Sequence, residues 1–249
     1  MHVELISYTP NPLGVIASAK GLMRGTHTKP DDFSEEEKLE AFADSAKTAL
    51  LSPFEFVNFV FDFTGVSRAF THQLVRTRMA SYVQESMRFS AKTGEQFEYY
   101  TPSDDVVFKG DEIGELWNQS MQSIQQSYEN LISAGAKVES ARGVLPTNIL
   151  TSVVMGIDYR NLLQMCDSRL CFQTQGEHRE AMLEIKRLFL DNPELLKMGE
   201  FLAPVCEHTG YCPWESKYDR PCPKQAIYPF RSEVLHHSKE IKKYLKTVK

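Results

Sequence analysis

The sequence has no long apolar run and no strong excess of either charge. Of its 249 residues 42% are apolar and 24% are charged, and the formal net charge is -5, which is typical of a soluble globular protein. No run of about 18 apolar residues occurs, so we predict no transmembrane helix and no membrane partner. The opening residues, MHVELISYTP, lack a basic region followed by an apolar core, so we expect no secretory signal and a cytoplasmic protein.

Cysteine is scarce, and the five residues are Cys166, Cys171, Cys206, Cys212 and Cys222. An odd count without an expected secretory signal argues against a disulfide framework. The last three could form a zinc site together with His208, but their spacing lacks a C-x2-C pair. The sequence therefore favours a plain or redox-sensitive tail and no metal. Cys166 and Cys171 lie on or near an apolar helical pattern and are predicted to pack in the core.

Glycine-rich phosphate loops are also missing. No two of the thirteen glycines are two residues apart and no Gly-Lys-Ser/Thr occurs, which excludes the G-x-G-x-x-G and P-loop signatures. A bound phosphate would therefore have to be held by arginines. Residues 71–90, THQLVRTRMASYVQESMRFS, contain three arginines and one acid, Glu85, and Arg68 lies just upstream. This local charge predicts a small anionic ligand and no nucleic acid, with a solvated helix face as the plain alternative.

Hydrophobic periodicity predicts the α+β class, with a mixed or antiparallel sheet packed by long helices and no internal domain boundary. Strands are expected at 3–9 and 54–63, while 148–159 is a strand or a buried helix. Helices are expected at 11–25, 34–51, 67–78, 111–135, 136–146, 160–170 and 177–190. Ser34 with Glu37 and Ser67 are candidate N-caps, and Gly25 and Gly135 are candidate helix ends.

The arginines fall into motifs that follow a fixed order. Arg76, Thr77, Arg78, Ser81, Ser86 and Arg88 follow the pattern R-x-R-x-x-S, four residues, then S-x-R. SPFE at 52–55 precedes this pattern and ARGVLP at 141–146 follows it. Arg160 and Arg169 come next, with eight residues between them and QTQGE after them. Over about residues 45–225 the chain resembles the flavin-dependent thymidylate synthases, whose signature is R-H-R-x-x-S followed by S-x-R. The segments APVCEHTGYCPW and RPCP resemble the cysteine-bearing tail of one branch.

This resemblance implies a single domain of that family over 1–225, followed by a basic C-terminal tail or helix at 226–249. It implies a homotetramer whose active sites form where subunits meet. It further implies that FAD transfers a one-carbon unit from methylenetetrahydrofolate to C5 of dUMP, that NADPH is the reductant, and that dTMP is the product. The cofactor would supply the difficult chemistry and the protein would supply placement and charge.

The resemblance also assigns site residues. Arg169 and Ser86 would be catalytic, with Arg169 stabilising negative charge on the pyrimidine ring. Arg88 and Arg142 would hold the nucleotide phosphate. The dUMP site as a whole would comprise Gln73, Arg76, Gln84, Glu85, Ser86, Met87, Arg88, Arg142 and Arg169. The FAD site would comprise Arg76, Thr77, Arg78, Gln84, Asp158, Arg160 and Gln164.

Three departures from the family pattern fall on the flavin or folate side. Thr77 replaces the signature histidine, Phe56 replaces a second histidine, and Asp158 replaces the asparagine of an Asn-x-Arg element. Threonine has neither the flat face nor the protonatable nitrogen of imidazole. Alternative functions are therefore a related C5 modification, such as hydroxymethylation of dUMP or use of dCMP, and a non-catalytic nucleotide-binding protein. A nucleic-acid binder that uses the arginine face is disfavoured by the acidic total.

Overall fold

The computed structural model describes residues 1–249 except 49, 103–110, 215–221, 225–226, 229 and 231–249. Within them the chain is α+β, with an antiparallel sheet of order β1-β2-β4-β3. The strands are β1 (His2–Tyr8), β2 (Asn58–Ser67), β4 (Leu150–Asp158) and the edge strand β3 (Ala80–Gln84). The predicted fold class is confirmed, and 148–159 is resolved in favour of a strand. Of the predicted tail at 226–249 only residues 227, 228 and 230 are described.

Strand β2 provides most of the aromatic core. Phe59, Phe61 and Phe63 alternate along it and are fully buried on one face. The prediction of a strand at 54–63 was wrong at its start, because Ser52–Phe56 forms a 3-10 turn with Pro53 near its first position. The strand also runs on to Ser67 through a bulge, where the register shifts and Gly65 adopts φ 63°.

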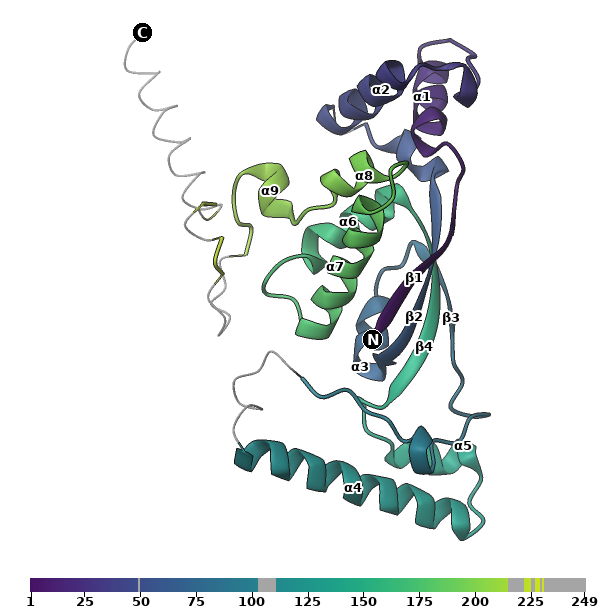
Figure 1. Cartoon of the computed structure of the whole chain (residues 1–249), viewed down its shortest axis with the longest axis vertical. Coiled ribbons are helices and arrows are strands. Elements are labelled where there is room, and N and C mark those ends of the chain that lie inside the picture. The colour runs from purple at the N-terminus through teal and green to yellow at the C-terminus, as the bar shows by residue number, and fades with distance from the viewer. Residues whose placement is uncertain (49, 103–110, 215–221, 225–226, 229, 231–249) are drawn as a thin grey trace.

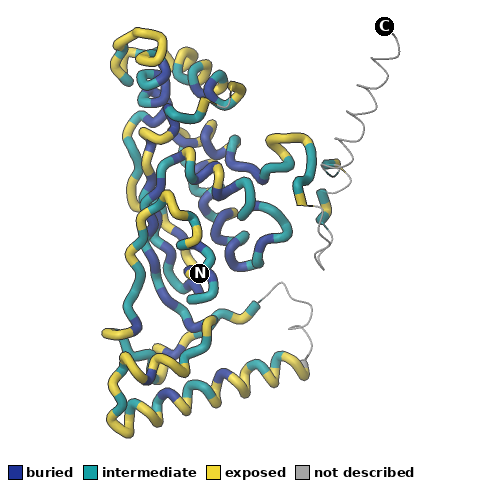
Figure 2. The backbone as a smooth tube through the Cα atoms, turned by 180° about the vertical axis from the view of Figure 1, so that it is seen from behind, coloured by how far each residue is buried: buried dark blue, intermediate teal, exposed yellow. Residues whose placement is uncertain are grey.

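Helices cover one face of this sheet. α6 (Tyr159–Arg169), α7 (Gly176–Leu190) and α8 (Leu196–Phe201) lie on the same side of it in Figure 1. Their apolar side chains join those of β2 and β4 in the main core, and buried positions concentrate there in Figure 2. No helix among the described residues covers the opposite face of the sheet, where Val83 of β3 pairs with Val154 of β4 and is 74% exposed.

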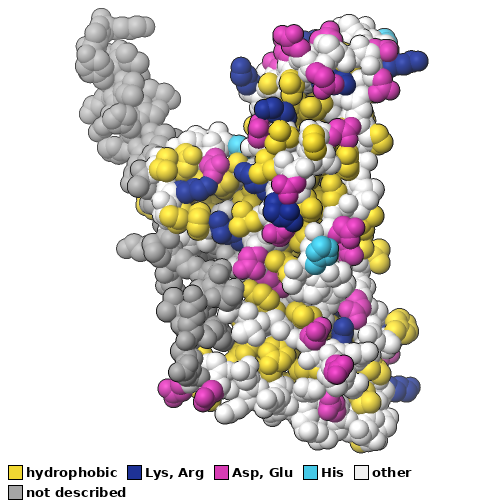
Figure 3. Space-filling model, viewed as in Figure 1, with side chains coloured by type: hydrophobic (Ala, Val, Ile, Leu, Met, Phe, Trp, Pro, Cys, Tyr) yellow, Lys and Arg dark blue, Asp and Glu magenta, His cyan; other side chains and the backbone are white. Residues whose placement is uncertain are grey.

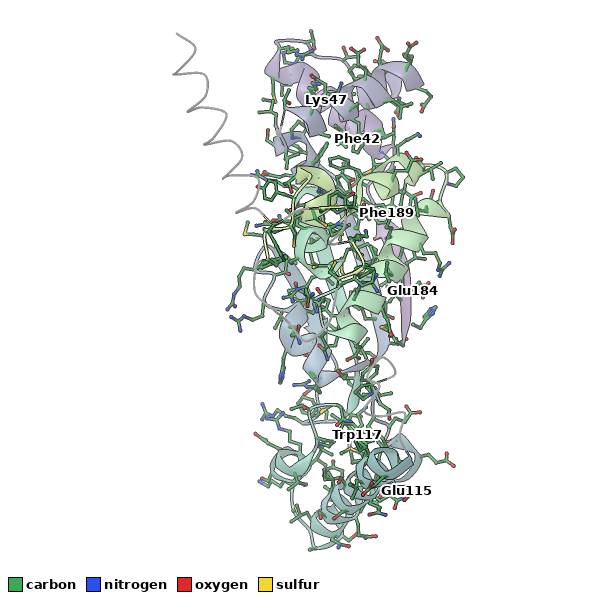
Figure 4. All side chains as sticks on the ribbon, turned by 90° about the vertical axis from the view of Figure 1, so that its left-hand side faces the viewer. Phe42, Lys47, Glu115, Trp117, Glu184 and Phe189 are labelled. Carbon is green, nitrogen blue, oxygen red and sulfur yellow. The ribbon has the colours of Figure 1, made fainter. Side chains whose placement is uncertain are left out.

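A pair of helices forms one end of the molecule. α1 (Pro12–Met23) packs against α2 (Glu35–Lys47). α2 begins with the predicted capping box, in which Ser34 accepts from the Glu37 N–H and the Glu37 carboxylate accepts from the Ser34 N–H. Phe42 of α2 stacks on Phe54 with ring centroids 5.3 Å apart, which joins this end to the core. Figure 4 labels Phe42 and the core residue Phe189.

The opposite end carries α4 (Asp111–Ser133) and α5 (Val138–Ala141), followed by the 3-10 turn Arg142–Val144. Figures 1 and 4 show α4, with Glu115 and Trp117 labelled, apart from the main helical layer. A small second cluster around Met87, Phe97 and Ile149 supports this end. Gly135 has φ 89° just past α4, as expected of a helix-terminating glycine.

The helix that leads into the basic stretch is shorter than the sequence pattern predicts. α3 (Arg68–Leu74) ends four residues before the expected end at 78, and the chain turns there and enters β3. The Tyr82 hydroxyl faces the carbonyl oxygens of Leu74 and Thr77 at 2.9 and 3.0 Å. This tertiary contact satisfies the end of the helix and sends the backbone into an edge strand that the sequence pattern did not reveal.

Near the C-terminal end, α9 (Val205–Thr209) closes at Gly210, which adopts φ 77°. Cys166 is buried in the core, as predicted. Cys171 is only half-buried, so its assignment to the core was wrong, because it follows the end of α6 in a connecting segment. None of the helices in the described ranges has both the length and the apolar character needed to cross a membrane.

Candidate active site

The start of α3 is fixed by a buried carboxylate. Ser67 caps α3 by accepting from the Phe70 N–H at 2.9 Å. The Ser67 N–H in turn donates to Glu177 at 2.6 Å, and its hydroxyl lies against the other oxygen of the same carboxylate. Burial raises the pKa of Glu177, although these hydrogen bonds act in the opposite direction. The contact joins the first turns of α3 and α7, and it thereby positions the arginine-rich segment that follows.

A pocket of about 380 Å3 opens between the turn after α3 and the outer face of α6. Its described lining is Arg76, Thr77, Arg78, Met79, Asn161, Gln164, Met165, Ser168 and Arg169. No acidic side chain is among these residues. Burial, and then the charge of Arg76, lower the pKa of Arg169. Two guanidinium groups therefore lie close together without a lining carboxylate, an arrangement that favours a bound anion.

Two predicted site glutamines lie outside this pocket's lining and make hydrogen bonds of their own. Gln73 on α3 donates to the Gln175 side chain at 2.7 Å, and Gln175 is the residue before α7. Gln84, at the end of β3, donates to the Thr71 hydroxyl of α3 at 2.8 Å. The Gln73 amide is therefore held by the residue before α7, and the Gln84 amide is held by α3. Because an amide both donates and accepts, this pair suits the hydrogen-bonding edge of a pyrimidine.

A second arginine group lies toward the α5 end. Arg68 is partly buried, and burial followed by the charge of Arg142 lowers its pKa, while Glu85 acts in the opposite direction. Arg142 follows α5 and is exposed. Arg88 pairs with Glu139 of α5 at 3.0 Å with both side chains about half exposed. An exposed pair of this kind contributes about 0–1 kcal/mol, so a phosphate could displace Glu139.

Between these groups the S-x-R loop is held by its own contacts. The Arg88 N–H donates to the Ser86 hydroxyl at 3.3 Å, and Met87 is buried in the small second cluster. Glu85 pairs with Lys92 at 2.7 Å. Burial would raise the pKa of Glu85, but the hydrogen bond and charge of Lys92 outweigh burial and the pKa is lowered. Glu85 is thus an ionised anchor of the loop.

The flavin-side positions lie along α6. Asp158 caps this helix by accepting from the Asn161 N–H at 2.9 Å, so its carboxylate already has a structural role. Arg160 forms an ion pair with Glu55 of the 52–56 turn. Gln164 lies one helical turn further along and lines the pocket. Phe56 is 60% exposed and lines a different, apolar groove beside α1.

A buried histidine lies close to Arg169. His178 is fully buried on α7 against Phe70, with ring centroids 4.9 Å apart. Burial, and then the charge of Arg169, lower the pKa of His178 to about 3. The ring therefore stays neutral at physiological pH, and positive charge in this region comes from the arginines alone.

The structure brings some predicted site residues together and separates others. Arg76, Thr77, Arg78, Gln164 and Arg169 share one pocket, whereas Glu85, Ser86, Met87, Arg88 and Arg142 belong to the region around α5. Sequence reasoning left six neighbours out of the site: Arg68, Met79, Asn161, Met165, Ser168 and Gln175. Arg68 lay just upstream of the quoted basic stretch, Met79 lay within it, and Gln175 lay within the QTQGE segment. Nothing in the sequence marked Asn161 or Ser168 except their place on the Gln164 face of α6.

Charges of both signs are mixed on one face of the molecule. On the face drawn in Figure 3, basic and acidic side chains are interspersed with apolar ones. Within the described ranges, no three His, Cys, Asp or Glu side chains are arranged as a metal site.

Comparison with known proteins identifies the class. Residues 4–192 match the Thy1 family, described as thymidylate synthase complementing protein. The chain belongs to this family, as its motifs predict. It is 33% identical over 237 residues to a protein of Clostridium tetani named flavin-dependent thymidylate synthase, covering 86% of this chain and 90% of that one. A protein with the same name from Nitratidesulfovibrio vulgaris is 31% identical and covers 94% of this chain and 97% of that one. Another from Pyrococcus furiosus is also 31% identical and covers 86% of this chain and 89% of that one.

Proposed function

We propose that this chain is a flavin-dependent thymidylate synthase that transfers a one-carbon unit from methylenetetrahydrofolate to C5 of dUMP, with FAD as cofactor and NADPH as reductant, and that dTMP is the product. The observation that carries the proposal is the pocket in which Arg76, Arg78 and Arg169 converge without an acidic lining residue. In a family of thymidylate synthases, such a site suits a phosphate-bearing cofactor and an anionic pyrimidine.

The chain's own residues have distinct tasks toward dUMP in this proposal. Arg88 and Arg142 bind the phosphate, with Arg88 leaving its exposed partner Glu139. Gln73, which Gln175 holds in place, and Gln84, which Thr71 holds in place, contact the base together with Ser86. Arg169 lies at the pyrimidine ring and stabilises negative charge there as C5 becomes nucleophilic. A guanidinium that remains charged throughout needs no reorganisation at that moment, which is the advantage of preorganised electrostatics.

The pocket residues also fit a flavin dinucleotide. When bound, FAD would supply the reducing equivalents of the reaction. Arg76 and Arg78 would bind its phosphates, and Gln164 and Arg160 would contact it along α6. Asp158 would act indirectly by fixing the first turn of that helix. Thr77 lines the pocket where the family signature has histidine, so a hydroxyl and a methyl group replace an aromatic ring at that wall.

The proposed assembly is a homotetramer with active sites at subunit boundaries. The sheet face away from α6 and α7 supports this proposal, because Val83 is exposed beside Val154 and no described helix covers them. A site whose two arginine groups lie on different regions of the chain also suits completion by neighbouring subunits.

The experiment is to mix the purified protein with FAD, NADPH, methylenetetrahydrofolate and dUMP, and to identify the nucleotide by mass. Conversion to dTMP is the expected result. Unchanged dUMP, despite bound FAD, would overturn the proposed reaction.

A second candidate is a sister enzyme that modifies C5 differently, by hydroxymethylation of dUMP or with dCMP as substrate. Thr77 in the pocket and the exposed Phe56 favour it, because both replace histidines on the side of the cofactor. A product heavier than dUMP by a hydroxymethyl group, or turnover of dCMP, would support this candidate over the first.

A further inference from the structure

Two hydrogen bonds within the chain hold the side-chain amides of Gln73 and Gln84, which the proposed function assigns to the pyrimidine base. We propose that their partners, Gln175 and Thr71, are positioning residues that make the nucleotide site select uracil over cytosine. This inference rests on the proposed function, because it takes the base contacts of the two glutamines from it. Neither partner has to touch the nucleotide, since each acts through the glutamine that it holds.

The Thr71 hydroxyl fixes which end of the Gln84 amide faces it. Thr71 is fully buried on α3. Its hydroxyl donates to the Arg68 carbonyl oxygen at 3.0 Å and accepts from the Gln84 side-chain nitrogen at 2.8 Å. A hydroxyl has one proton, and this one is already donated to the backbone. The amide nitrogen of Gln84 is therefore kept toward Thr71, and its carbonyl oxygen is turned away.

Gln175 holds the Gln73 amide in the same sense. The Gln73 side-chain nitrogen donates to the Gln175 side-chain oxygen at 2.7 Å. The backbone of Gln175 is itself restrained, because its carbonyl oxygen accepts from the Arg179 N–H at 3.0 Å in the first turn of α7. Just before it, the Thr174 hydroxyl donates to the Ser168 carbonyl oxygen at 2.7 Å. The amide nitrogen of Gln73 therefore faces a partner on a well-anchored segment.

Both contacts lie beside the segments that form the proposed nucleotide site. The Gln73 carbonyl oxygen accepts from the Arg76 N–H at 3.1 Å, at the start of the turn that carries Arg76 into the arginine pocket. Gln175 ends the short connection that follows Arg169. The bond between the two glutamines thus joins the segments of both pocket arginines. Gln84 is the last residue of β3 and leads into the S-x-R loop.

Uracil and cytosine differ in the edge that such amides would read. In uracil N3 carries a hydrogen and donates, while the oxygen on C4 accepts. In cytosine N3 accepts, while the amino group on C4 donates. Because donor and acceptor are exchanged, an amide that pairs with uracil must turn by about 180° to pair with cytosine. An amide that is free to turn would therefore discriminate poorly between these two bases.

The two held amides resist this rotation. A reversed Gln84 would set its carbonyl oxygen against the Thr71 oxygen, whose proton is donated elsewhere. A reversed Gln73 would set its carbonyl oxygen against that of Gln175. Each reversal loses a hydrogen bond and brings two acceptors together. The arrangement therefore fits one of the two bases, and membership in a family of thymidylate synthases favours uracil.

The test compares the dissociation constants of dUMP and dCMP, measured by titration calorimetry on the full-length protein with FAD and without NADPH or folate. Both nucleotides carry the same phosphate, so the ratio of their dissociation constants reports on the base. We expect wild type to bind dUMP about 100-fold more tightly, because cytosine leaves polar groups unpaired. Thr71→Val and Gln175→Leu should reduce the ratio to about tenfold or less, since the freed amide can turn.

Matched variants separate orientation of the amides from general stability. Thr71→Ser keeps the hydroxyl and Gln175→Glu keeps an oxygen that accepts, so both should retain the wild-type ratio. Thr48→Val removes a hydroxyl that donates to the Asp44 carbonyl oxygen in α2 and should leave the ratio unchanged. Gln126→Leu removes an exposed amide of α4 and should also leave it unchanged. A merely structural role would lower stability, or both affinities together, without changing the ratio.

Equal binding of dUMP and dCMP by wild type, or tighter binding of dCMP, would overturn the proposal. An unchanged ratio in both Thr71→Val and Gln175→Leu would also overturn it, as would an equal fall in Thr71→Ser and Thr71→Val. The ratio is measured without turnover, so its outcome is distinguishable from that of the proposed reaction. Selective dUMP binding without dTMP formation would reject the reaction alone, whereas dTMP formation with an unchanged ratio in the variants would reject the selectivity alone.

Discussion

The guanidinium groups of Arg76 and Arg169 line the same pocket, and the charge of Arg76 lowers the pKa of Arg169. These residues are 93 positions apart in the sequence, as the numbers 76 and 169 show. Arg76 lies in the turn after α3, and Arg169 is the last residue of α6. Two like charges held close together weaken the fold unless something compensates them. A bound anion would compensate the two guanidinium charges, so the pocket should be most stable with an anion in it.

The Arg88–Glu139 pair predicts that one acid competes with the nucleotide. Arg88→Gln should weaken dUMP binding about tenfold or more, because a charge-assisted bond to phosphate contributes about 1.5–3 kcal/mol. Glu139→Gln should bind dUMP as tightly as wild type or a few-fold more tightly, because it frees Arg88. Titration calorimetry measures both. Weaker binding in both variants would mean that the ion pair itself shapes the site.

The Thr77→His substitution restores the signature histidine and tests the proposed cofactor-binding role of the arginine pocket. Thr77 lines the arginine pocket, and its backbone carbonyl, which the Tyr82 hydroxyl contacts, does not depend on the side chain. Thr77→His should therefore fold normally and bind FAD several-fold more tightly, because imidazole adds a flat face and a nitrogen donor. Flavin fluorescence on titration measures the affinity. As a control, Ser133→His changes an exposed residue of α4, outside the signature and the pocket lining, and should leave FAD affinity unchanged.

The buried carboxylate of Glu177 should matter for stability. Glu177→Ala removes the acceptor for the Ser67 N–H and leaves a buried donor without a partner, so we expect a loss of about 1–3 kcal/mol in the free energy of unfolding. Urea denaturation measures this loss. Glu200→Ala, which removes an exposed helix-surface partner of Lys197, should change stability by less than about 0.5 kcal/mol. Equal effects would show that the Ser67–Glu177 contact contributes nothing specific.

His208 predicts a pH-dependent contribution to stability. The hydrogen bond that its ring donates to the Asp167 carboxylate is the main cause that raises the pKa of His208 above the ordinary value near 6.5, against the effect of burial. A group whose pKa is raised on folding stabilises the protein fully below its unfolded pKa and loses this effect as pH rises through its folded pKa. The melting-temperature gap between wild type and His208→Gln should therefore be wide at about pH 6 and narrow toward about pH 8. A gap that does not change with pH, or an equal trend in the exposed His2→Gln control, would contradict this.

Local signals predicted much of the fold because they act within a few residues. The Ser34 capping box and the glycine after α4 formed where expected, since each satisfies backbone groups of its own helix. The start of β2 was misplaced because aromatic alternation in 54–63 hides a turn at Pro53. The edge strand β3 was missed because its shape depends on pairing with β4 and on Tyr82 reaching back to α3.

The candidate site was predicted from ordered motifs more than from physics. Periodicity could not show that Arg76 and Arg169 share a pocket, because only the fold brings the turn after α3 to the end of α6. Arg68 was left out of the site because its closeness to Arg142 depends on the packing of the α5 end. Cys171 was assigned to the core because the apolar pattern around it did not show that α6 ends at Arg169.

The most direct test is whether dTMP formation depends on the guanidinium group of Arg169. Formation of dTMP from dUMP would be measured by mass for wild type, Arg169→Lys and Arg187→Lys, with FAD, NADPH and methylenetetrahydrofolate at saturation. Arg187 is an exposed arginine paired with Glu184 and Asp191, so its variant controls for the substitution itself. We expect dTMP from wild type and Arg187→Lys, and a loss of about 100-fold or more in Arg169→Lys, because lysine lacks the planar fork. Equal dTMP formation by both variants, or none by wild type, would contradict it.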